Sequence, residues 1–196
     1  MFHKISPGEP SLKRTFVAID AGMPEPLAGA LDACRTALSG EGIRWVRAGR
    51  MHLTLKFLGD TPANLIPSIT GELQAAASGF ENFSLELEGL GVFRSLKHPR
   101  VLWAGVRQNT ILEGLHAEIQ NRLQPYGFPG RSEGFSPHLT LGRMKRIVDP
   151  ERLKRFLDRM GGVSFGQVSV REVVYFESIL APSGARYRII SRLPLR

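Results

Sequence analysis

The chain has 196 residues, of which 42% are hydrophobic and 22% charged, with 26 Lys and Arg against 18 Asp and Glu. This composition is ordinary for a globular protein with a buried core, and a single cysteine, Cys34, excludes an internal disulfide and a cysteine-rich zinc site. No apolar run reaches the roughly 18 residues that span a bilayer, and residues 1–14 lack the apolar stretch of a signal peptide, so we expect a cytoplasmic protein with no membrane association. The net charge of +8 favours a polyanionic partner such as nucleic acid.

The first half of the chain predicts strands and helices in alternation. Residues 1–13, rich in Pro and Gly, are expected to form a flexible leader, and residues 14–196 a single domain. Hydrophobic periodicity then predicts, in order, a strand over 14–20, a helix over 26–38, a short strand over 43–46, a strand that begins at His52, and a helix over 63–77.

The second half predicts a similar series. The expected elements are strands over 83–90 and 101–106, a helix over 110–124, a strand that begins at His138, a helix over 150–160, and strands over 165–170, 173–180 and 185–192. Hairpins mixed with helices favour an α+β fold with mostly antiparallel sheets, built from two related halves. No Gly-x-Gly-x-x-Gly or P-loop pattern supports a nucleotide-binding fold.

The tetrapeptide His-Leu-Thr-Leu occurs twice, at residues 52–55 and 138–141, with 86 positions between equivalent residues. In a strand, alternate side chains share a face, so each copy places its His and Thr on one side and its two Leu on the other. One His-x-Thr pair alone is more often a structural cross-strand pair. Two identical copies, each followed by Gly and basic residues, predict one symmetric site.

Two histidines and two threonines suit acid-base chemistry at phosphorus. Histidine titrates near neutral pH, so His52 and His138 can divide the roles of proton donor and proton acceptor. The hydroxyls of Thr54 and Thr140 can donate hydrogen bonds to phosphoryl oxygens, and no metal or other cofactor is required. Arg143 would join the site if its strand bends at Gly142, although a solvent-facing arginine explains it equally well.

Other chemistries fit the residues less well. A zinc or iron site would use two histidines, but neither tetrapeptide contains a carboxylate or thiol, and Asp60 lies eight residues beyond His52. A serine hydrolase is disfavoured because no Gly-x-Ser-x-Gly elbow is present. Phe57 and Tyr187 are candidates to stack on a nucleobase, with core packing as the competing interpretation.

The chain also resembles a known family along nearly all of residues 14–195. The resemblance is carried by RTFVAID, IRWVRAGRMHLTLKFLGD, LELEGLGVFRSLKHPRVLWAGV, FSPHLTLGRMK and FESILAPSGARYRIISRLPL. These segments resemble the two-histidine (2H) phosphoesterases, specifically the RNA 2′,3′-cyclic phosphodiesterases, also called 2′-5′ RNA ligases, of the ThpR/LigT type.

The resemblance implies a bilobal α+β fold with pseudo-twofold symmetry, two mostly antiparallel sheets lining a central cleft, and helices on the outside. It implies hydrolysis of RNA 2′,3′-cyclic phosphate ends to 2′-phosphomonoesters, with His52 as proton donor, His138 as proton acceptor, and Thr54 and Thr140 on the phosphoryl oxygens. Joining of RNA by 2′-5′ bonds, with tRNA fragments among the partners, is a further implication, and we expect a monomer.

Two alternatives remain open at this stage. A phosphodiesterase for small cyclic nucleotides or 2′-5′ oligonucleotides would carry the same motifs. A non-catalytic protein that binds RNA ends would also be basic, although binding alone would be served by Arg or Lys in place of the two histidines.

Overall fold

The computed structural model describes residues 11–130, 134–181 and 184–196. Its strands are β1 (Leu12–Asp20), β2 (Gly42–Trp45), β3 (His52–Pro62), β4 (Phe83–Phe93), β5 (Val101–Val106), β6 (His138–Arg146), β7 (Ser164–Val170), β8 (Glu172–Ile179) and β9 (Arg186–Pro194). Its α-helices are α1 (Glu25–Ala37), α2 (Ile66–Ala77), α3 (Thr110–Leu123) and α4 (Pro150–Met160), with short 3-10 turns η1 (Ala48–Arg50), η2 (Ala63–Leu65) and η3 (Gln124–Tyr126).

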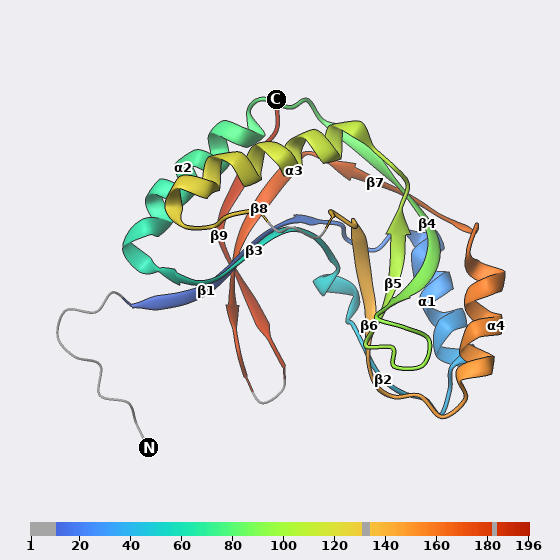
Figure 1. Cartoon of the computed structure of the whole chain (residues 1–196). Helices are drawn as coiled ribbons and strands as arrows, with labels where there is room; N and C mark the ends of the chain where they lie inside the picture. The colour runs from blue at the N-terminus through green and yellow to red at the C-terminus, as the bar shows by residue number, and fades with distance from the viewer. Residues whose placement is uncertain (1–10, 131–133, 182–183) are drawn as a thin grey trace, which may run out of the picture.

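The strands form one curved antiparallel sheet, in the order β7-β4-β5-β6-β3-β1-β8-β9, with β2 paired to β6 (Figure 1). This confirms the expected α+β class. The two expected sheets are continuous with each other, because β3 and β6 pair near their N-terminal ends through Leu53 and Leu139. Each half therefore contributes one motif strand to the centre of the sheet.

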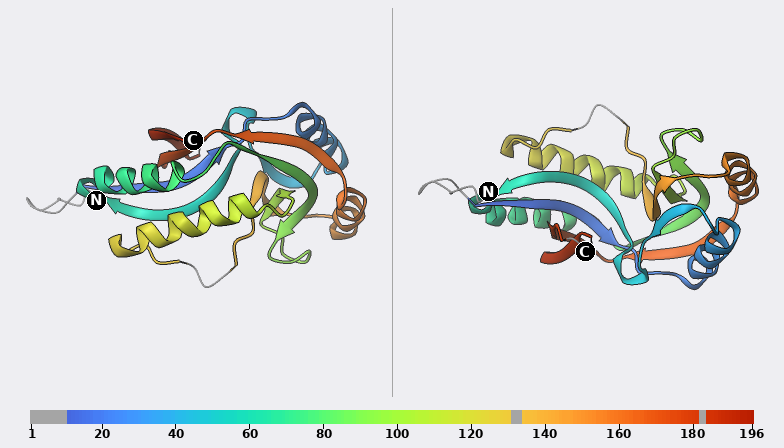
Figure 2. Two further views of the ribbon diagram at one scale, coloured as in Figure 1. Left: turned by 90° about the horizontal axis from the view of Figure 1, so that it is seen from above. Right: turned by 90° about the horizontal axis from the view of Figure 1, so that it is seen from below.

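The helices cover the two halves separately (Figures 1 and 2). Helices α2 and α3 pack on the half that contains β3, β8 and β9, whereas α1 and α4 pack on the half that contains β4 and β7. Side chains at helical spacing face the sheet, as in α3, where Leu112, Leu115, Ile119 and Leu123 are all buried. The side chain of Asn109 caps α3 by accepting a hydrogen bond from the Leu112 backbone N–H at 2.9 Å.

Several element boundaries differ by one to three residues from the sequence expectations. Strand β1 begins at Leu12, so residues 12 and 13, which were expected to end a leader over residues 1–13, belong to the sheet. Residues 1–10 lie outside the described part of the chain. Strand β4 runs to Phe93, past the expected end at residue 90, because Gly89 forms a bulge with φ of 73° and pairing then resumes. Helix α2 begins at Ile66, since β3 and η2 occupy the residues before it.

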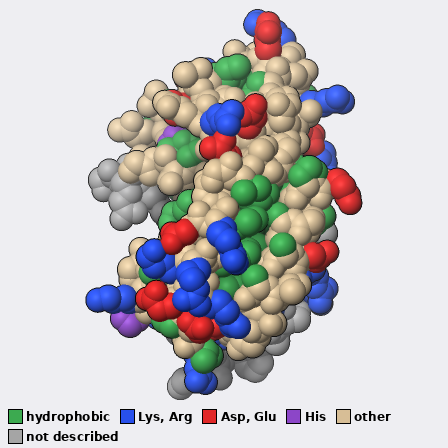
Figure 3. Space-filling view, turned by 90° about the vertical axis from the view of Figure 1, so that its right-hand side faces the viewer, with side chains coloured by type: hydrophobic (Ala, Val, Ile, Leu, Met, Phe, Trp, Pro, Cys, Tyr) green, Lys and Arg blue, Asp and Glu red, His purple; other side chains and the backbone are tan. Residues whose placement is uncertain are grey.

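The face that carries α1 and α4 shows basic and acidic side chains interspersed (Figure 3). Several of them are paired, including Lys154 with Asp158 at 2.7 Å and Arg35 with Asp32 at 2.9 Å. No helix of the described residues is long and apolar enough to cross a membrane.

Candidate active site

The two motif strands bring both copies of His-x-Thr to one place. Because β3 and β6 are antiparallel and pair at Leu53 and Leu139, the register sets His52 opposite Thr140 and Thr54 opposite His138. Directly opposed residues share a face of the sheet. We call the face that carries these four polar residues the motif face; each of the four is half-buried.

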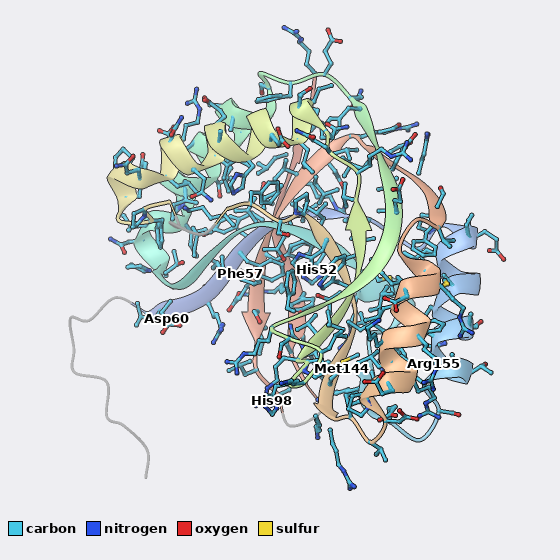
Figure 4. All side chains as sticks on the ribbon, turned by 45° about the vertical axis from the view of Figure 1, so that its right-hand side comes forward. His52, Phe57, Asp60, His98, Met144 and Arg155 are labelled. Atoms are coloured by element: carbon cyan, nitrogen blue, oxygen red, sulfur yellow. The ribbon has the colours of Figure 1, made fainter. Side chains whose placement is uncertain are left out.

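The leucines of both motifs lie on the other face. Leu53, Leu55, Leu139 and Leu141 are no more than 3% exposed and belong to the main hydrophobic core. The predicted division of each tetrapeptide into a core side and a polar side is therefore observed. Figure 4 shows His52 near the middle of the molecule, where the two halves meet.

Both imidazole rings are held in the same way. Nδ1 of His52 lies 3.0 Å from the Arg50 carbonyl oxygen, and Nδ1 of His138 lies 2.8 Å from the Ser136 carbonyl oxygen. A carbonyl only accepts, so Nδ1 carries the proton and donates in both rings. Nε2 is then the working nitrogen of each histidine, and no described residue forms a hydrogen bond with either Nε2.

The threonine hydroxyls are also available. Neither Thr54 nor Thr140 forms a side-chain hydrogen bond within the described part of the chain, although both hydroxyls sit on the motif face beside an imidazole. Two imidazole nitrogens and two hydroxyls can therefore all engage one small ligand.

A β-bulge follows each threonine. On β3, residues Thr54 and Lys56 pair with consecutive residues of β1, so Leu55 is the extra residue. On β6, residues Thr140 and Gly142 pair with consecutive residues of β5, so Leu141 is the extra residue. A bulge shifts the alternation by one, which turns the fifth residue after each histidine onto the motif face.

The two residues turned in this way are Phe57 and Arg143, which occupy equivalent positions in the two halves. Arg143 thus joins the site, as the bend expected near Gly142 required, and its charge acts on both histidines. Phe57 is 55% exposed and its ring centroid lies 5.9 Å from that of Phe16 (Figure 4).

Both imidazoles pack against aromatic rings. His52 packs edge-on against Tyr187, with ring centroids 5.1 Å apart, and lies 5.1 Å from Phe16 and 6.4 Å from Phe176. His138 packs edge-on against Phe93 at 4.5 Å. Tyr187, a predicted substrate residue, is thereby placed beside His52, and all seven predicted site residues lie on or beside the motif face.

The surroundings lower the pKa of both histidines below the ordinary value of 6.5. For His52, burial lowers the pKa most, the Arg50 carbonyl and Asp20 raise it, and Arg143 and His138 lower it further. For His138, burial lowers the pKa, the Ser136 carbonyl raises it, and Arg143 lowers it. Both rings are therefore mainly neutral at pH 7 in the unliganded protein.

A pocket of about 390 Å³ opens beside His52. Its lining includes Asp20, Arg50, Phe176, Arg186 and Tyr187. The sequence did not predict Asp20, Arg50 and Arg186 as site residues. Asp20 and Arg186 reach the pocket through strands β1 and β9, whereas Arg50 lies on η1, two residues before His52. Among the described residues no cluster of three or more His, Cys, Asp and Glu side chains could hold a metal ion.

A curved sheet made of two similar halves, each contributing one His-x-Thr strand to a shared face, is the architecture of a two-histidine phosphoesterase. The chain belongs to the family described as LigT like Phosphoesterase, which matches residues 17–103 and 107–187.

Similar proteins cover almost the whole chain. An RNA 2′,3′-cyclic phosphodiesterase of Thermotoga maritima is 32% identical over 177 residues, covering 90% of this chain and 92% of that protein. One of Archaeoglobus fulgidus is 32% identical, covering 89% and 96%. The crystal structure of Escherichia coli LigT complexed with 3′-AMP superposes with a TM-score of 0.69 at 26% identity, covering 94% of this chain and 98% of the other.

Proposed function

We propose that the protein hydrolyses RNA 2′,3′-cyclic phosphate ends to 2′-phosphomonoesters by two-histidine acid-base catalysis that needs no metal. The observation that carries the proposal is the shared orientation of the imidazoles: both donate from Nδ1 to a backbone carbonyl and present Nε2 on the motif face. The relatives named RNA 2′,3′-cyclic phosphodiesterase support this choice of substrate.

The proposed step uses each histidine once. Nε2 of neutral His138 accepts a proton from water as the water oxygen attacks phosphorus. The bond from phosphorus to the ribose 3′ oxygen breaks, and His52, protonated at Nε2, donates its proton to that oxygen. The product carries a 2′-phosphate and a 3′-hydroxyl, and proton exchange with solvent restores both rings.

The other residues act on charge and position. The hydroxyls of Thr54 and Thr140 donate to the non-bridging phosphoryl oxygens, where negative charge accumulates. Arg143 supplies fixed positive charge to the same oxygens. Tyr187, beside His52, and Phe57, which contacts Phe16, provide aromatic surfaces on which the terminal nucleobase can stack.

The same step accounts for 2′-5′ ligation. If the 5′-hydroxyl of a second RNA takes the place of water, its attack on phosphorus expels the 3′ oxygen and leaves a 2′-5′ phosphodiester. No ATP is consumed, because the reaction breaks one phosphodiester bond, that of the cyclic ester, and forms another in its place. tRNA fragments with a cyclic end and a 5′-hydroxyl end would serve as the two partners.

The test is hydrolysis of a short RNA with a 2′,3′-cyclic phosphate end in the presence of EDTA, using wild type, His52→Ala, His138→Ala and His98→Ala. His98 lies in the loop between β4 and β5, away from His52 (Figure 4), and serves as the matched control. We expect wild-type and His98→Ala rates to agree, and each motif variant to lose about 10²-fold or more.

Four outcomes would overturn the proposal. Activity that EDTA abolishes and a metal restores would show metal chemistry. Activity retained by both His52→Ala and His138→Ala would show that the two histidines do not take part in the reaction. Turnover of a cyclic mononucleotide but not of the RNA would favour a small-molecule phosphodiesterase, and tight RNA binding without turnover would favour an end-binding protein.

A further inference from the structure

The two halves of the site match at the motif residues but differ at the position that pairs directly with each histidine. Asp20, at the end of β1, pairs directly with His52 on β3. Gly105 on β5 pairs directly with His138 on β6. In an antiparallel pair these partners share a face, so the Asp20 side chain lies on the motif face beside His52, and the equivalent position beside His138 has no side chain.

The glycine in the second half is fixed by packing. A Cβ added at Gly105 would lie 2.6 Å from the Glu88 carbonyl oxygen, which is backbone and cannot rotate away. A carboxylate at position 105 is therefore incompatible with the pairing of β4 and β5. The fold admits a charged neighbour on the same face for His52 and excludes one at the matching position for His138.

Asp20 also faces the space that a ligand would enter. It lines the pocket beside His52 together with Arg50, Arg186 and Tyr187. Its carboxylate oxygen Oδ1 accepts a hydrogen bond from the Gly22 backbone N–H at 3.3 Å, which an Asn oxygen could equally accept. The acidic charge is therefore not needed for this turn.

We propose that Asp20 is the positioning residue that breaks the symmetry of the site and makes His52 the histidine that carries the proton. The inference rests on the proposed function for its catalytic meaning, since it assigns the roles of donor and acceptor within that reaction. Among the residues that pair directly with the two histidines, Asp20 beside His52 carries a charge, whereas Gly105 beside His138 has no side chain.

The charges around the two rings agree with this assignment. Asp20 raises the pKa of His52 against the lowering by burial, by Arg143 and by His138. No carboxylate among the described residues raises the pKa of His138. The remaining charged groups at the pocket, Arg50 and Arg186, are cations and cannot replace Asp20 in holding a proton on the ring.

The first test measures the two rings directly, without substrate. NMR titration of the imidazole signals is carried out for wild type, Asp20→Asn, Asp20→Glu and the control Asp60→Asn. Asp60 lies on the same strand as His52 but farther along β3, and it carries the same charge (Figure 4).

We expect Asp20→Asn to lower the pKa of His52 and to leave that of His138 nearly unchanged, with Asp20→Glu close to wild type. Asp60→Asn should leave both titrations unchanged. Equal shifts of both rings, or no shift of His52, would overturn the proposal. This outcome is independent of whether the protein hydrolyses RNA.

The second test is the pH profile of kcat/KM on RNA with a cyclic phosphate end. Loss of Asp20 moves the alkaline limb, which reports the acid, to lower pH and leaves the acidic limb in place. At about pH 8, on the alkaline side of the profile, kcat/KM of Asp20→Asn should be roughly tenfold lower than that of wild type. At low pH the two values should differ much less. A uniform loss at every pH that Asp20→Glu fails to rescue would show a merely structural role and contradict the proposal.

Discussion

The residue pair Leu53–Leu139, through which the motif strands β3 and β6 are paired, offers the sharpest test of how the fold supports the site. Leu139 is 0% exposed and Leu53, its register partner, is 1% exposed, so both side chains are packed under the histidines. Replacing Leu139 with Ala removes a buried isobutyl group and leaves a cavity there. The expected loss of unfolding free energy is about 3 kcal/mol, within the range of roughly 2 to 5 kcal/mol for such changes.

The cavity should also lower activity beyond its effect on stability. It lies at the single described residue pair that joins β3 to β6, so relaxation of the backbone there moves His52 relative to His138. Misplacement of reacting groups by about 1 Å can cost around 10²-fold in rate. We therefore expect kcat of Leu139→Ala to fall by roughly tenfold to 100-fold.

The matched control is Leu73→Ala, since Leu73 is 1% exposed but lies on α2, away from the motif strands. Urea unfolding gives the stability of each variant, and kcat is measured at a temperature where both are folded. Similar stability losses with a normal kcat only for Leu73→Ala would support the account. Equal kcat values would refute it, and Leu139→Val provides a milder version if Leu139→Ala does not fold.

Three further predictions concern single side chains. Thr54→Val and Thr140→Val should each lower kcat about 10²- to 10³-fold in the hydrolysis assay while Ser substitutions retain activity, since only the hydroxyl is needed; full activity of the Val variants would exclude the hydroxyls. The Glu41 carboxylate has no exposed surface and accepts from the Asp149 N–H at 3.1 Å and from Arg152 at 2.7 Å. Burial raises its pKa, but these donors and the Val148 N–H lower it more, to a net value below 4.5, so its stabilisation is present above that pH and lost as the pH falls through the folded-state pKa. Glu41→Gln should therefore cost about 2 kcal/mol in urea unfolding at neutral pH and less in acid, and a deficit that does not shrink would contradict this sign. Gly142→Ala should lower the free energy of unfolding by about 1 to 3 kcal/mol, because its Cβ would lie 2.7 Å from Ile43 Cγ2. The control Gly29→Ala, in α1 with no neighbour close to the added Cβ, should raise that free energy by about 0.5 to 1 kcal/mol. Equal effects of the two changes in thermal unfolding would be evidence against the close contact at Gly142.

Local patterns were enough to find the centre of the site. The repeat at His52 and His138, with alternation in a strand, predicted which side chains are buried in the core and which lie on the motif face. The helical spacing of Leu27, Ala30, Leu31 and Cys34 likewise predicted α1, where all four side chains are buried. These signals lie within a few residues of one another, so they do not depend on how the halves meet.

Features that depend on strand register could not be read from the sequence. Strict alternation from His138 would turn Arg143 away from the motif face, and only the bulge at Leu141 brings it back. Asp20 ends a strand 32 positions before His52 in the sequence, and their pairing follows from the β1–β3 register. The same holds for Arg186, which reaches the pocket from β9.

The proposed reaction is tested most directly by ³¹P NMR of the product that the wild-type protein forms, in the presence of EDTA, from an RNA with a 2′,3′-cyclic phosphate end. We expect a single product signal, that of the 2′-phosphomonoester, because His52 protonates the 3′ oxygen as its bond to phosphorus breaks. A 3′-phosphomonoester, a mixture of both isomers, or unchanged cyclic phosphate would contradict it.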